Sequence, residues 1–427
     1  CIEDEIPFEV PEGWAWARLR DICMMSAGKS KSTDQIKSEP FEGSYPCFGG
    51  NGVRGYVDEY NQDGIFSIVG RQGALCGNIN IAIGKFYATE HAVVTTLFDG
   101  IDFKWSNYIL EALRLNNYAT GAAQPGLSVA NILNVFVPVP PTQEQDRIGN
   151  NVYESLKIVE ALEQEKIDLQ KIIITAKTKI LDLAIRGKLV PQDPNDEPAS
   201  VLLERIRTEK EELIKQGKIK RDKKESVIFK GDDNSYYLRT GRVEESLEDW
   251  RFDDLPETWK ICCLGELCDY GDCINVNTED IAEDAWILDL EDIEKDTGTV
   301  LKKVTKDQRN SVSTKHKFHS GQVLYSKLRP YLNKVVLSDA DGYCTSEILP
   351  LEFKNCVLPE YARYYLMSGT FIAYANHCSY GVKMPRLGTT DGKKAIFSLP
   401  PLSEQKRIVE TIDFCFVQLN KISEALA

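Results

Sequence analysis

The stretch PVPPTQEQDRI at residues 138–148 returns as SLPPLSEQKRI at residues 398–408, 260 positions later. The two copies share both prolines, the Glu-Gln pair, the arginine and the final isoleucine. A period this long indicates a duplicated domain, because solenoids repeat every 20 to 50 residues. The fold is therefore expected to be built twice.

A second similarity marks the start of each copy. PEGWAWARLRDIC begins at Pro11 and PETWKICCLGELC begins at Pro256, an offset of only 245. The offset grows between this point and the end of the repeat. We therefore expect the second copy to carry an insertion within residues 270–320.

Each copy leads into a predicted helix. The Pro-Pro pairs end the strand-like runs NVFVPVPP and AIFSLPP. Thr142 and Ser403 are candidate N-caps, and Glu144 and Glu404 suit the positive end of a helix dipole. The first helix is expected to end near Gly187.

Apolar residues recur along both predicted helices at the alternating spacing of three and four that a coiled coil requires. In the first helix this seam comprises eight positions, seven of them apolar or small: Val159, Leu162, Lys166, Leu169, Ile173, Ala176, Ile180 and Leu183. In the second it comprises Ile408, Ile412, Cys415, Leu419 and Ile422. Because both sets share one register, the two helices are expected to pack against each other. The chain stops at Ala427, so the second helix should be the shorter one.

The region between the two copies is polar. LVPQDPNDEPAS at residues 189–200 predicts turns, and a short charged helix is expected at residues 200–216. The following run KIKRDKKES contains Lys218, Lys220, Arg221, Lys223 and Lys224. We interpret this run as a solvated linker, with phosphate contact as the alternative.

Each duplicated part is expected to be a mixed α/β domain. The runs GIFSIVG, INIAIG and HAVVTTLF in the first, and VLYSKL, KVVLSD and EILPLEF in the second, have the β-branched and aromatic content of strands. Helical stretches are predicted at residues 105–116 and 359–375. The predicted boundaries are 1–141 for the first domain, 142–187 for the long helix, 188–249 for the charged linker, 250–401 for the second domain and 402–427 for the short helix.

Bulk properties describe a globular chain. It has 427 residues, of which 42% are hydrophobic and 27% are charged. It contains no apolar run long enough for a transmembrane helix. The start CIEDEIPFEVPEGW lacks the basic and apolar regions of a signal peptide, and it lacks an initiator Met, so earlier residues are expected to be missing. The net charge of −14, taken alone, argues against nucleic acid as a partner.

The cysteines and histidines do not form a recognisable metal motif. Twelve cysteines are scattered without a CxxC pair, and the cluster Cys262, Cys263, Cys268 and Cys273 has no common zinc spacing. Free buried thiols are expected. His316 and His319 could join Cys344 in a metal site, but we interpret them as surface histidines of a loop.

Two short glycine-rich motifs resemble parts of catalytic sites. AGKS at residues 27–30 lacks the first glycine of a phosphate-binding loop. FGGNG at residues 48–52 fits the Phe-x-Gly-x-Gly of methyltransferases that bind S-adenosylmethionine. However, the Asn/Asp-Pro-Pro-aromatic motif of amino-methylating enzymes is absent, since Val139 and Leu399 precede the two Pro-Pro pairs. No catalytic residue, metal or cofactor is therefore predicted for this chain.

The order of these motifs resembles the specificity (S) subunit of type I restriction–modification systems. The resemblance rests on Pro-Glu-Gly-Trp at the start, the duplicated PPxxEQxRI, and LAIRGKLVPQDPNDEPAS at residues 183–200. It covers nearly the whole chain, with domain interiors that vary within the family.

The resemblance implies a function without catalysis. Each repeated domain would be a target recognition domain that reads one half of a split site in double-stranded DNA. The two helices would pack antiparallel as a spacer that fixes the half-site separation. Methyltransferase (M) subunits would dock on the chain, and motor–nuclease (R) subunits would join them, in the cytoplasm and away from membranes. Partner subunits would hold most of the DNA, so the acidic net charge is no obstacle.

The duplication also suggests which residues read bases. Positions that differ between the copies are better candidates than shared ones, because the two half-sites should differ. Arg, Lys, Asn and Gln of the loops suit base edges. The candidates are Lys29, Lys31, Asn51, Arg54, Gln72 and Asn78 in the first domain, and Lys327, Tyr331, Asn333, Lys334, Lys383 and Arg386 in the second.

Two shared Arg–Glu pairs have a structural interpretation. Arg71 matches Arg329 and Glu90 matches Glu347, at offsets of 258 and 257. We expect an internal salt bridge in each domain, with DNA contact by the arginine as the alternative.

Two other functions remain open at this point. One is an S-adenosylmethionine-dependent DNA methyltransferase that acts alone, with its cofactor at Phe48–Gly52. The other is a coiled-coil scaffold with two protein-binding domains and no affinity for DNA.

Overall fold

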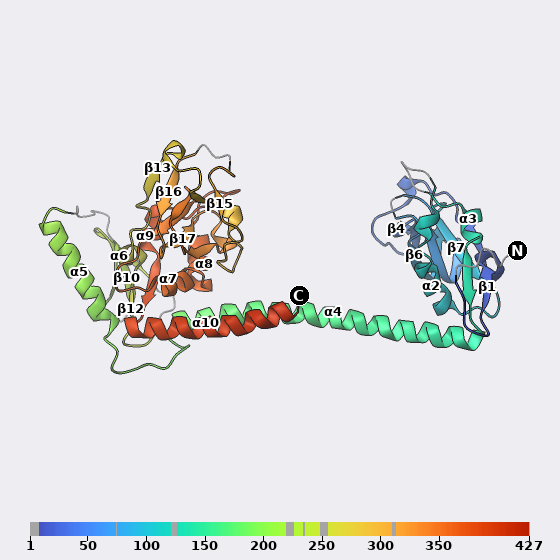
Figure 1. Cartoon of the computed structure of the whole chain (residues 1–427), viewed down its shortest axis with the longest axis horizontal. Helices are drawn as coiled ribbons and strands as arrows, with labels where there is room; N and C mark the ends of the chain where they lie inside the picture. Colours follow the sequence, from blue (N-terminus) through green and yellow to red (C-terminus); the bar gives the residue numbers. More distant parts are fainter. Residues whose placement is uncertain are drawn as a thin grey trace. The chain divides into compact units, whose positions relative to one another are not determined.

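The structure is a computed structural model that describes residues 8–73, 75–120, 126–218, 226–233, 235–247, 255–309 and 313–426. It divides into two compact units between Glu165 and Lys166, within the long helix α4 (Thr142–Ile185) (Figure 1). The basic residues Lys220, Arg221, Lys223 and Lys224 lie outside the described residues. None of the described helices is long and apolar enough to cross a membrane.

The first unit is built on a six-stranded sheet. Its strand order is β2-β7-β5-β6-β3-β4. The strands are β2 (Cys23–Ala27), β3 (Tyr45–Gly49), β4 (Gly52–Val57), β5 (Gln62–Gly70), β6 (Ile79–Ala88) and β7 (Ala92–Leu97). The helices α1 (Leu19–Ile22), α2 (Phe103–Ala112) and α3 (Val129–Leu133) contribute Leu19, Trp105 and Ile132 to a core shared with Val69 and Val93 of the sheet.

The second unit repeats the central part of this sheet. Strand β17 (Val323–Ser326) lies between β18 (Val335–Leu337) and β20 (Ile348–Leu351), as β5 lies between β6 and β7. The register is conserved as well: Val69 opposes Ile79 and Gly70 opposes Ala92, while Tyr325 opposes Val335 and Ser326 opposes Ile348. Every one of these correspondences has an offset of 256. The predicted duplication is confirmed at the level of strand pairing.

A two-stranded ribbon closes each copy. It pairs β1 (Ala15–Arg18) with β8 (Phe136–Val139) in the first unit, and β12 (Lys260–Cys263) with β21 (Ile396–Leu399) in the second. From the ribbon onward, the helices of the second copy are α6 (Leu264–Leu267), α7 (Pro359–Leu366), α8 (Gly369–His377), α9 (Thr389–Lys394) and α10 (Leu402–Ala425).

The second unit contains a further five-stranded sheet. Its strand order is β13-β16-β19-β14-β15. The strands are β13 (Ile274–Val276), β14 (Trp286–Leu288), β15 (Val304–Thr305), β16 (Lys315–Phe318) and β19 (Gly342–Thr345). Ile287 opposes Tyr343 as Cys47 opposes Tyr87, so β14 and β19 repeat the pairing of β3 with β6. The extra residues of the second copy lie between β14 and β16, within residues 270–320, where the insertion was expected. His316 is part of β16 and buried, with Nδ1 2.8 Å from the carbonyl of Ile348, so its interpretation as a surface loop residue was wrong.

The region between the two copies contains more structure than the expected short helix. That helix is α5 (Ala199–Lys215). After it, β9 (Ser226–Lys230), β10 (Tyr236–Thr240) and β11 (Val243–Ser246) form a three-stranded antiparallel sheet. Ile228 and Leu238 of this sheet pack against Ile261 and Ile396 of the closing ribbon. These strands were missed because charged residues interrupt their apolar pattern.

The duplicated PPxxEQ motif builds one corner of each unit. The indole of Trp14 donates to Glu144 at 3.1 Å, and that of Trp259 donates to Glu404 at 2.9 Å. The following glutamine accepts from a backbone amide at the start of α2 or α7: Asp102 N to Gln145 and Leu358 N to Gln405, both at 2.8 Å. The motif is therefore structural, joining the first ribbon strand, the helix and the domain core.

The predicted N-caps are wrong by one or two positions. Thr142 is the first residue of α4, and its hydroxyl donates to the carbonyl of Gly100 at 3.1 Å. Ser403 lies inside α10, whose N-cap is Pro401. Each helix is instead preceded by a proline, whose carbonyl accepts from the amide of Gln145 or Gln405 at 3.0 Å.

The C-terminal part of α4 packs antiparallel to α10, as Figure 1 shows. Lys177 donates to Asn420 at 2.6 Å, while Gln192, beyond the end of α4, bonds Glu404 near the start of α10. Leu181 and Ala184 share a buried cluster with Ile408 and Ile412. The predicted pairing of the two helices is confirmed for this part. Val159, Leu162 and Leu169 of the predicted seam are exposed.

Candidate nucleic-acid interface

One loop occupies the same position in both units. It joins β5 to β6 at residues 70–78 and β17 to β18 at residues 326–334, and we call it the strand loop. Gly70 N donates to Asn78 O at 2.9 Å, and Ser326 N donates to Lys334 O at 3.1 Å. The same backbone closure therefore carries different side chains in the two units.

A hairpin lies beside the strand loop in the second unit. It runs from Tyr380 to Arg386, and we call it the bridge hairpin; in the first unit Thr120 and Gly126 form the equivalent bridge. Its two end residues exchange both backbone hydrogen bonds, at 2.9 and 3.0 Å in the first unit and at 3.1 and 3.0 Å in the second. The residue after it donates to the strand loop, Leu127 N to Arg71 O and Leu387 N to Lys327 O.

This register corrects the predicted matching of arginines. Arg71 N donates to His91 O at 3.1 Å, and Lys327 N donates to Glu347 O at 3.0 Å. Arg71 therefore corresponds to Lys327, and His91 corresponds to Glu347. The expected salt bridges are wrong: Glu347 binds Arg386 at 2.8 Å, and Glu90 lies 3.5 Å from His91.

Three candidate readers of the first unit meet at one edge. Asn51, in the turn between β3 and β4, accepts from Asn78 Nδ2 at 2.9 Å. A Cβ at Gly50 would lie 3.2 Å from the carbonyl of Gln72, and one at Gly70 would lie 1.8 Å from the carbonyl of Gly50. Glycine at both positions lets the β3–β4 turn rest on the strand loop.

The other candidates of the first unit lie around this edge. Arg54 donates to Thr33 at 3.1 Å and remains exposed, and Lys29 is exposed at the end of β2. Lys31 is held by Glu59 at 2.7 Å, with only 9% of its side chain exposed. Burial and this partner give Lys31 a structural role here.

The candidates of the second unit divide in the same way. Tyr331 and Lys383 are exposed, and Lys327 is half-buried. The remaining three candidates bind other parts of their own unit. Asn333 Nδ2 donates to Met367 O at 3.4 Å, and Lys334 Nζ donates to Leu290 O at 2.6 Å. Arg386 binds Glu347.

Sequence reasoning missed two features of this edge. Glu347 holds the guanidinium of Arg386, and the sequence places these residues 39 positions apart without a motif. Val382 and Met384 expose apolar side chains on the bridge hairpin. A search restricted to polar side chains could not have found them.

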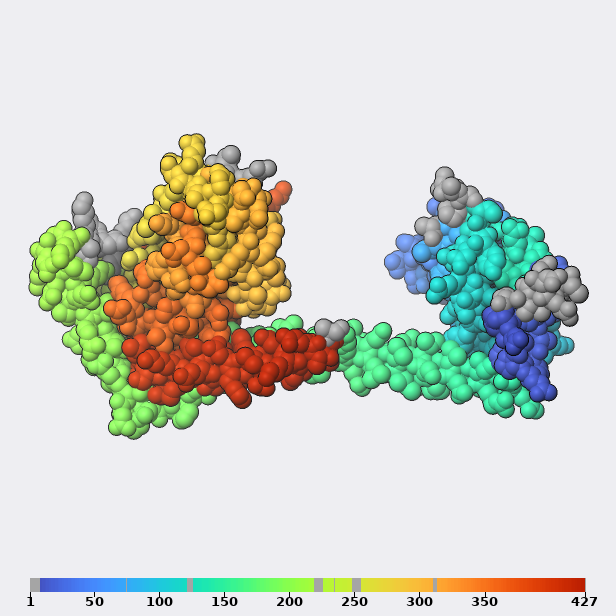
Figure 2. All heavy atoms as spheres, in the orientation of Figure 1, coloured from blue at the N-terminus to red at the C-terminus, as the bar shows by residue number. Residues whose placement is uncertain are grey.

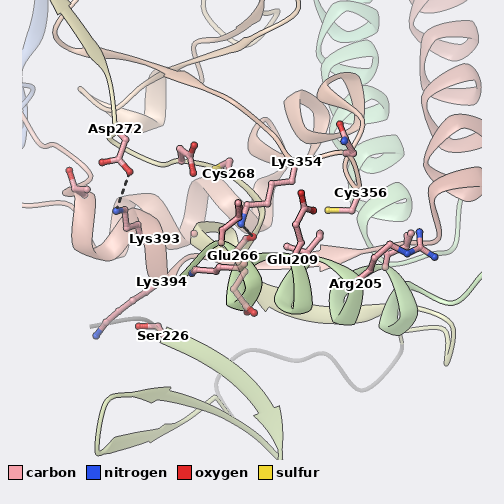
Figure 3. A pocket seen from close by; sticks show the side chains of 18 of the residues that line it. Arg205, Glu209, Ser226, Glu266, Cys268, Asp272, Lys354, Cys356, Lys393 and Lys394 are labelled. Atoms are coloured by element: carbon pink, nitrogen blue, oxygen red, sulfur yellow. Dashed lines mark hydrogen bonds and ion pairs between the residues drawn. The ribbon is translucent and has the colours of Figure 1, made fainter. Parts of the chain in front are cut away.

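A separate pocket of about 1210 Å³ lies between α5, α6 and α9 (Figure 3). Its lining contains both cations and carboxylates. Lys393 lies 3.7 Å from Asp272, and Lys354 donates to the carbonyl of Glu266 at 2.8 Å. None of the candidate base readers lines it.

The described residues contain no cluster of His, Cys, Asp and Glu suited to a metal ion. Eleven cysteines are described and all are free, as expected. Burial raises the pKa of Cys23 to about 12 and that of Cys356 to about 11. Thiols with raised pKa values are poor nucleophiles and metal ligands near neutral pH.

Comparison with known protein families matches residues 11–176 and 256–425 to the family described as "Type I restriction modification DNA specificity domain". The two matched ranges contain the two copies of the repeat. The chain belongs to this family. It is a type I restriction–modification DNA specificity subunit with two recognition domains.

Curated relatives of the specificity subunit carry the same description. The EcoAI specificity subunit of Escherichia coli is 25% identical over 98% of this chain and 80% of its own length. The EcoDI specificity subunit of E. coli is 21% identical over 97% of this chain and 84% of its own. The EcoprrI specificity subunit of E. coli is 50% identical, but the match spans only 28% of this chain and 31% of that protein.

Solved structures show the same fold. The HsdS subunit from Thermoanaerobacter tengcongensis is 15% identical, with a TM-score of 0.54 over 99% of this chain and 93% of that one. A chain from a structure of type I R-M complex assembly and conformational transition is 14% identical, also with a TM-score of 0.54, over 98% of the specificity subunit and 94% of its own length.

Proposed function

We propose that the specificity subunit reads a bipartite site in double-stranded DNA, one half with each recognition domain, and carries no catalytic activity of its own. The observation that supports this most directly is the duplicated edge. Each unit holds a strand loop and the bridge beside it on the same backbone bonds, while the side chains on them differ. Two edges with the same backbone but different side chains suit two half-sites of different sequence.

The proposed readers are the candidates whose side chains are accessible at this edge. In the first unit they are Lys29, Asn51, Arg54, Gln72 and Asn78, and in the second they are Lys327, Tyr331 and Lys383. We propose that Lys31, Asn333, Lys334 and Arg386 support the loops instead, because each is engaged with another part of its own unit.

We propose that M subunits dock on the two helices and that R subunits join the resulting complex. Apolar side chains support this. Val159, Leu162 and Leu169 are exposed along α4, and Phe414 and Val417 are exposed on α10, which lies at the surface of the second unit in Figure 2. Exposed apolar stripes of this kind mark protein contacts. The free thiols suit the reducing cytoplasm, where we place the complex.

The test is methyl transfer from labelled S-adenosylmethionine to duplex DNA. The purified chain alone should transfer none, and addition of the M subunit should produce transfer that depends on DNA sequence. Transfer by the chain alone, with S-adenosylmethionine bound near Phe48–Gly52, would establish the methyltransferase alternative. A complex that binds all duplexes equally would contradict sequence reading.

A further inference from the structure

The bridge hairpin of the second unit presents apolar side chains to solvent. Val382 is fully exposed at its tip, and Tyr380 and Met384 are 62% and 44% exposed. Lys383, between Val382 and Met384, is exposed as well. Three neighbouring apolar side chains that find no cover in their own unit indicate a contact surface.

The stem of this hairpin is fixed at several points. Arg329 N donates to Pro385 O at 2.7 Å, in addition to the bonds between Tyr380 and Arg386. The guanidinium of Arg386 reaches both oxygens of Glu347 at 2.8 to 3.1 Å and the carbonyl of Met384 at 3.2 Å. The tip is therefore held in place before any partner arrives, which lowers the entropic cost of binding.

The surroundings of the tip suit an anionic partner. Lys383 is on the tip itself, and Lys327 is joined to the base of the hairpin through Leu387 N. The carboxylate of Glu347, which lies nearest to the stem, is neutralised by Arg386. Tyr331, 48% exposed, follows Arg329 on the strand loop. An apolar tip that carries a lysine matches a DNA groove, where phosphates border the base edges.

Comparison with the corresponding segment of the first unit shows which residues of the hairpin are shared between the copies and which are changed. The sequences are TGAAQPG at residues 120–126 and YGVKMPR at residues 380–386. Both keep Gly at the second position and Pro at the sixth. The positions of Val382, Lys383 and Met384 are instead Ala, Ala and Gln in the first unit, at residues that lie outside the described ones. The backbone bonds between the end residues are retained and the residues between them are changed, as expected for a part that distinguishes half-sites.

We propose that Val382 and Met384 read thymine by packing against its C5-methyl group in the major groove. This inference rests on the proposed function. The thymine methyl is the apolar group that base edges display in that groove, and it distinguishes the A·T pair by contact without a hydrogen bond. The bridge hairpin therefore contributes specificity through an apolar contact, alongside the polar readers of the strand loop.

The test uses the full chain in complex with its M subunit, and a duplex that carries the sequence at which this complex methylates DNA. Each thymine of the site is replaced in turn by deoxyuridine, which lacks only the methyl group, and the dissociation constant is measured. At one thymine the replacement should weaken binding about fourfold, the factor that corresponds to one buried methyl-sized group. With Val382→Ala this loss should shrink toward none. Val243→Ala, at an exposed valine of β11, is the matched control and should keep the full loss.

Three results would overturn the inference while leaving the proposed function intact. These are equal binding of every deoxyuridine duplex by the wild type, an undiminished loss in Val382→Ala, and a site without thymine in either half. If Val382→Ala prevents assembly with the M subunit and spares DNA binding, the tip contacts protein and the inference also fails. A complex with no sequence preference would remove the proposed function and the inference together.

Discussion

The same motif residue has different surroundings in the two copies. Glu144 is half-buried and accepts from Trp14, whereas Glu404 is fully buried and accepts from both Trp259 and Gln192. Segment 188–198 accounts for the difference, because it lies over the second corner, where Asp196 also binds Arg407 at 2.6 Å. Burial raises the pKa of Glu404, although its hydrogen bonds oppose the shift.

Replacement of Glu404 by glutamine should change how stability depends on pH. Since the pKa of Glu404 is raised in the folded chain, its contribution to stability is present below the ordinary carboxyl pKa and is lost as pH rises through the raised value. Glu404→Gln, which cannot ionise, should therefore gain stability relative to the wild type as pH rises from 4 to 7. Urea unfolding across this range measures the difference. Glu144→Gln, where solvent reaches the carboxylate, is the matched control. A constant difference between Glu404→Gln and wild type would contradict the argument.

Gly187, just past the end of α4, should not tolerate a side chain. Its φ is +66°, and a Cβ would lie 2.5 Å from Pro256 Cγ. Gly217, just past α5, has a φ of +72° but open space around it. Gly217→Ala should cost about 1 kcal/mol for the left-handed backbone alone. Gly187→Ala should cost clearly more, because the clash adds to this strain. Thermal unfolding of both variants checks this, and equal costs would show that the segment shifts freely.

At the scale of elements, much of the architecture could be predicted from local pattern. The central strands of both units, α5, the end of α4 and the strands before each Pro-Pro pair follow from apolar runs, helix signals and the prolines, whereas β9, β10 and β11 do not. The register between the copies could not be predicted, because single matching residues such as Arg71 and Arg329 do not locate insertions. The pairing of Glu347 with Arg386 depends on where β20 and the bridge hairpin meet, which no local pattern encodes.

The packing of α4 on α10 gives the prediction at the scale of elements. Leu181 is buried in the cluster that holds Ile408 and Ile412, whereas Ile174, two turns earlier, is 64% exposed. Leu181→Ala should cost about 2–5 kcal/mol, the usual range for a buried leucine. Ile174→Ala should change stability by less than about 0.5 kcal/mol. Hydrogen exchange along α10 measures both effects. If α10 keeps its protection in Leu181→Ala, the contact is not what holds it.

At the scale of the whole molecule, duplication is the feature that joins fold and function. Each recognition domain has an edge formed by its strand loop, and the side chains at this edge differ between the two domains. The candidate site could be predicted only in outline. Loop composition selected residues that gather at this edge, but it could not separate exposed candidates from Lys31, Lys334 and Arg386, whose partners are distant in sequence. An acidic net charge of −14 also fits this plan, since only the two edges need face DNA.

The most direct test of two independent readers is genome-wide mapping of methylated bases in cells that carry the M subunit. The map is made with the wild-type chain, without the chain, and with Arg54→Ala or Lys383→Ala. We predict a split motif with two unlike halves that disappears without the chain. Arg54→Ala should relax only one half, and Lys383→Ala only the other, with losses of about 1–3 kcal/mol for each base contact removed. A motif that persists without the chain, or single substitutions that alter both halves alike, would contradict the account.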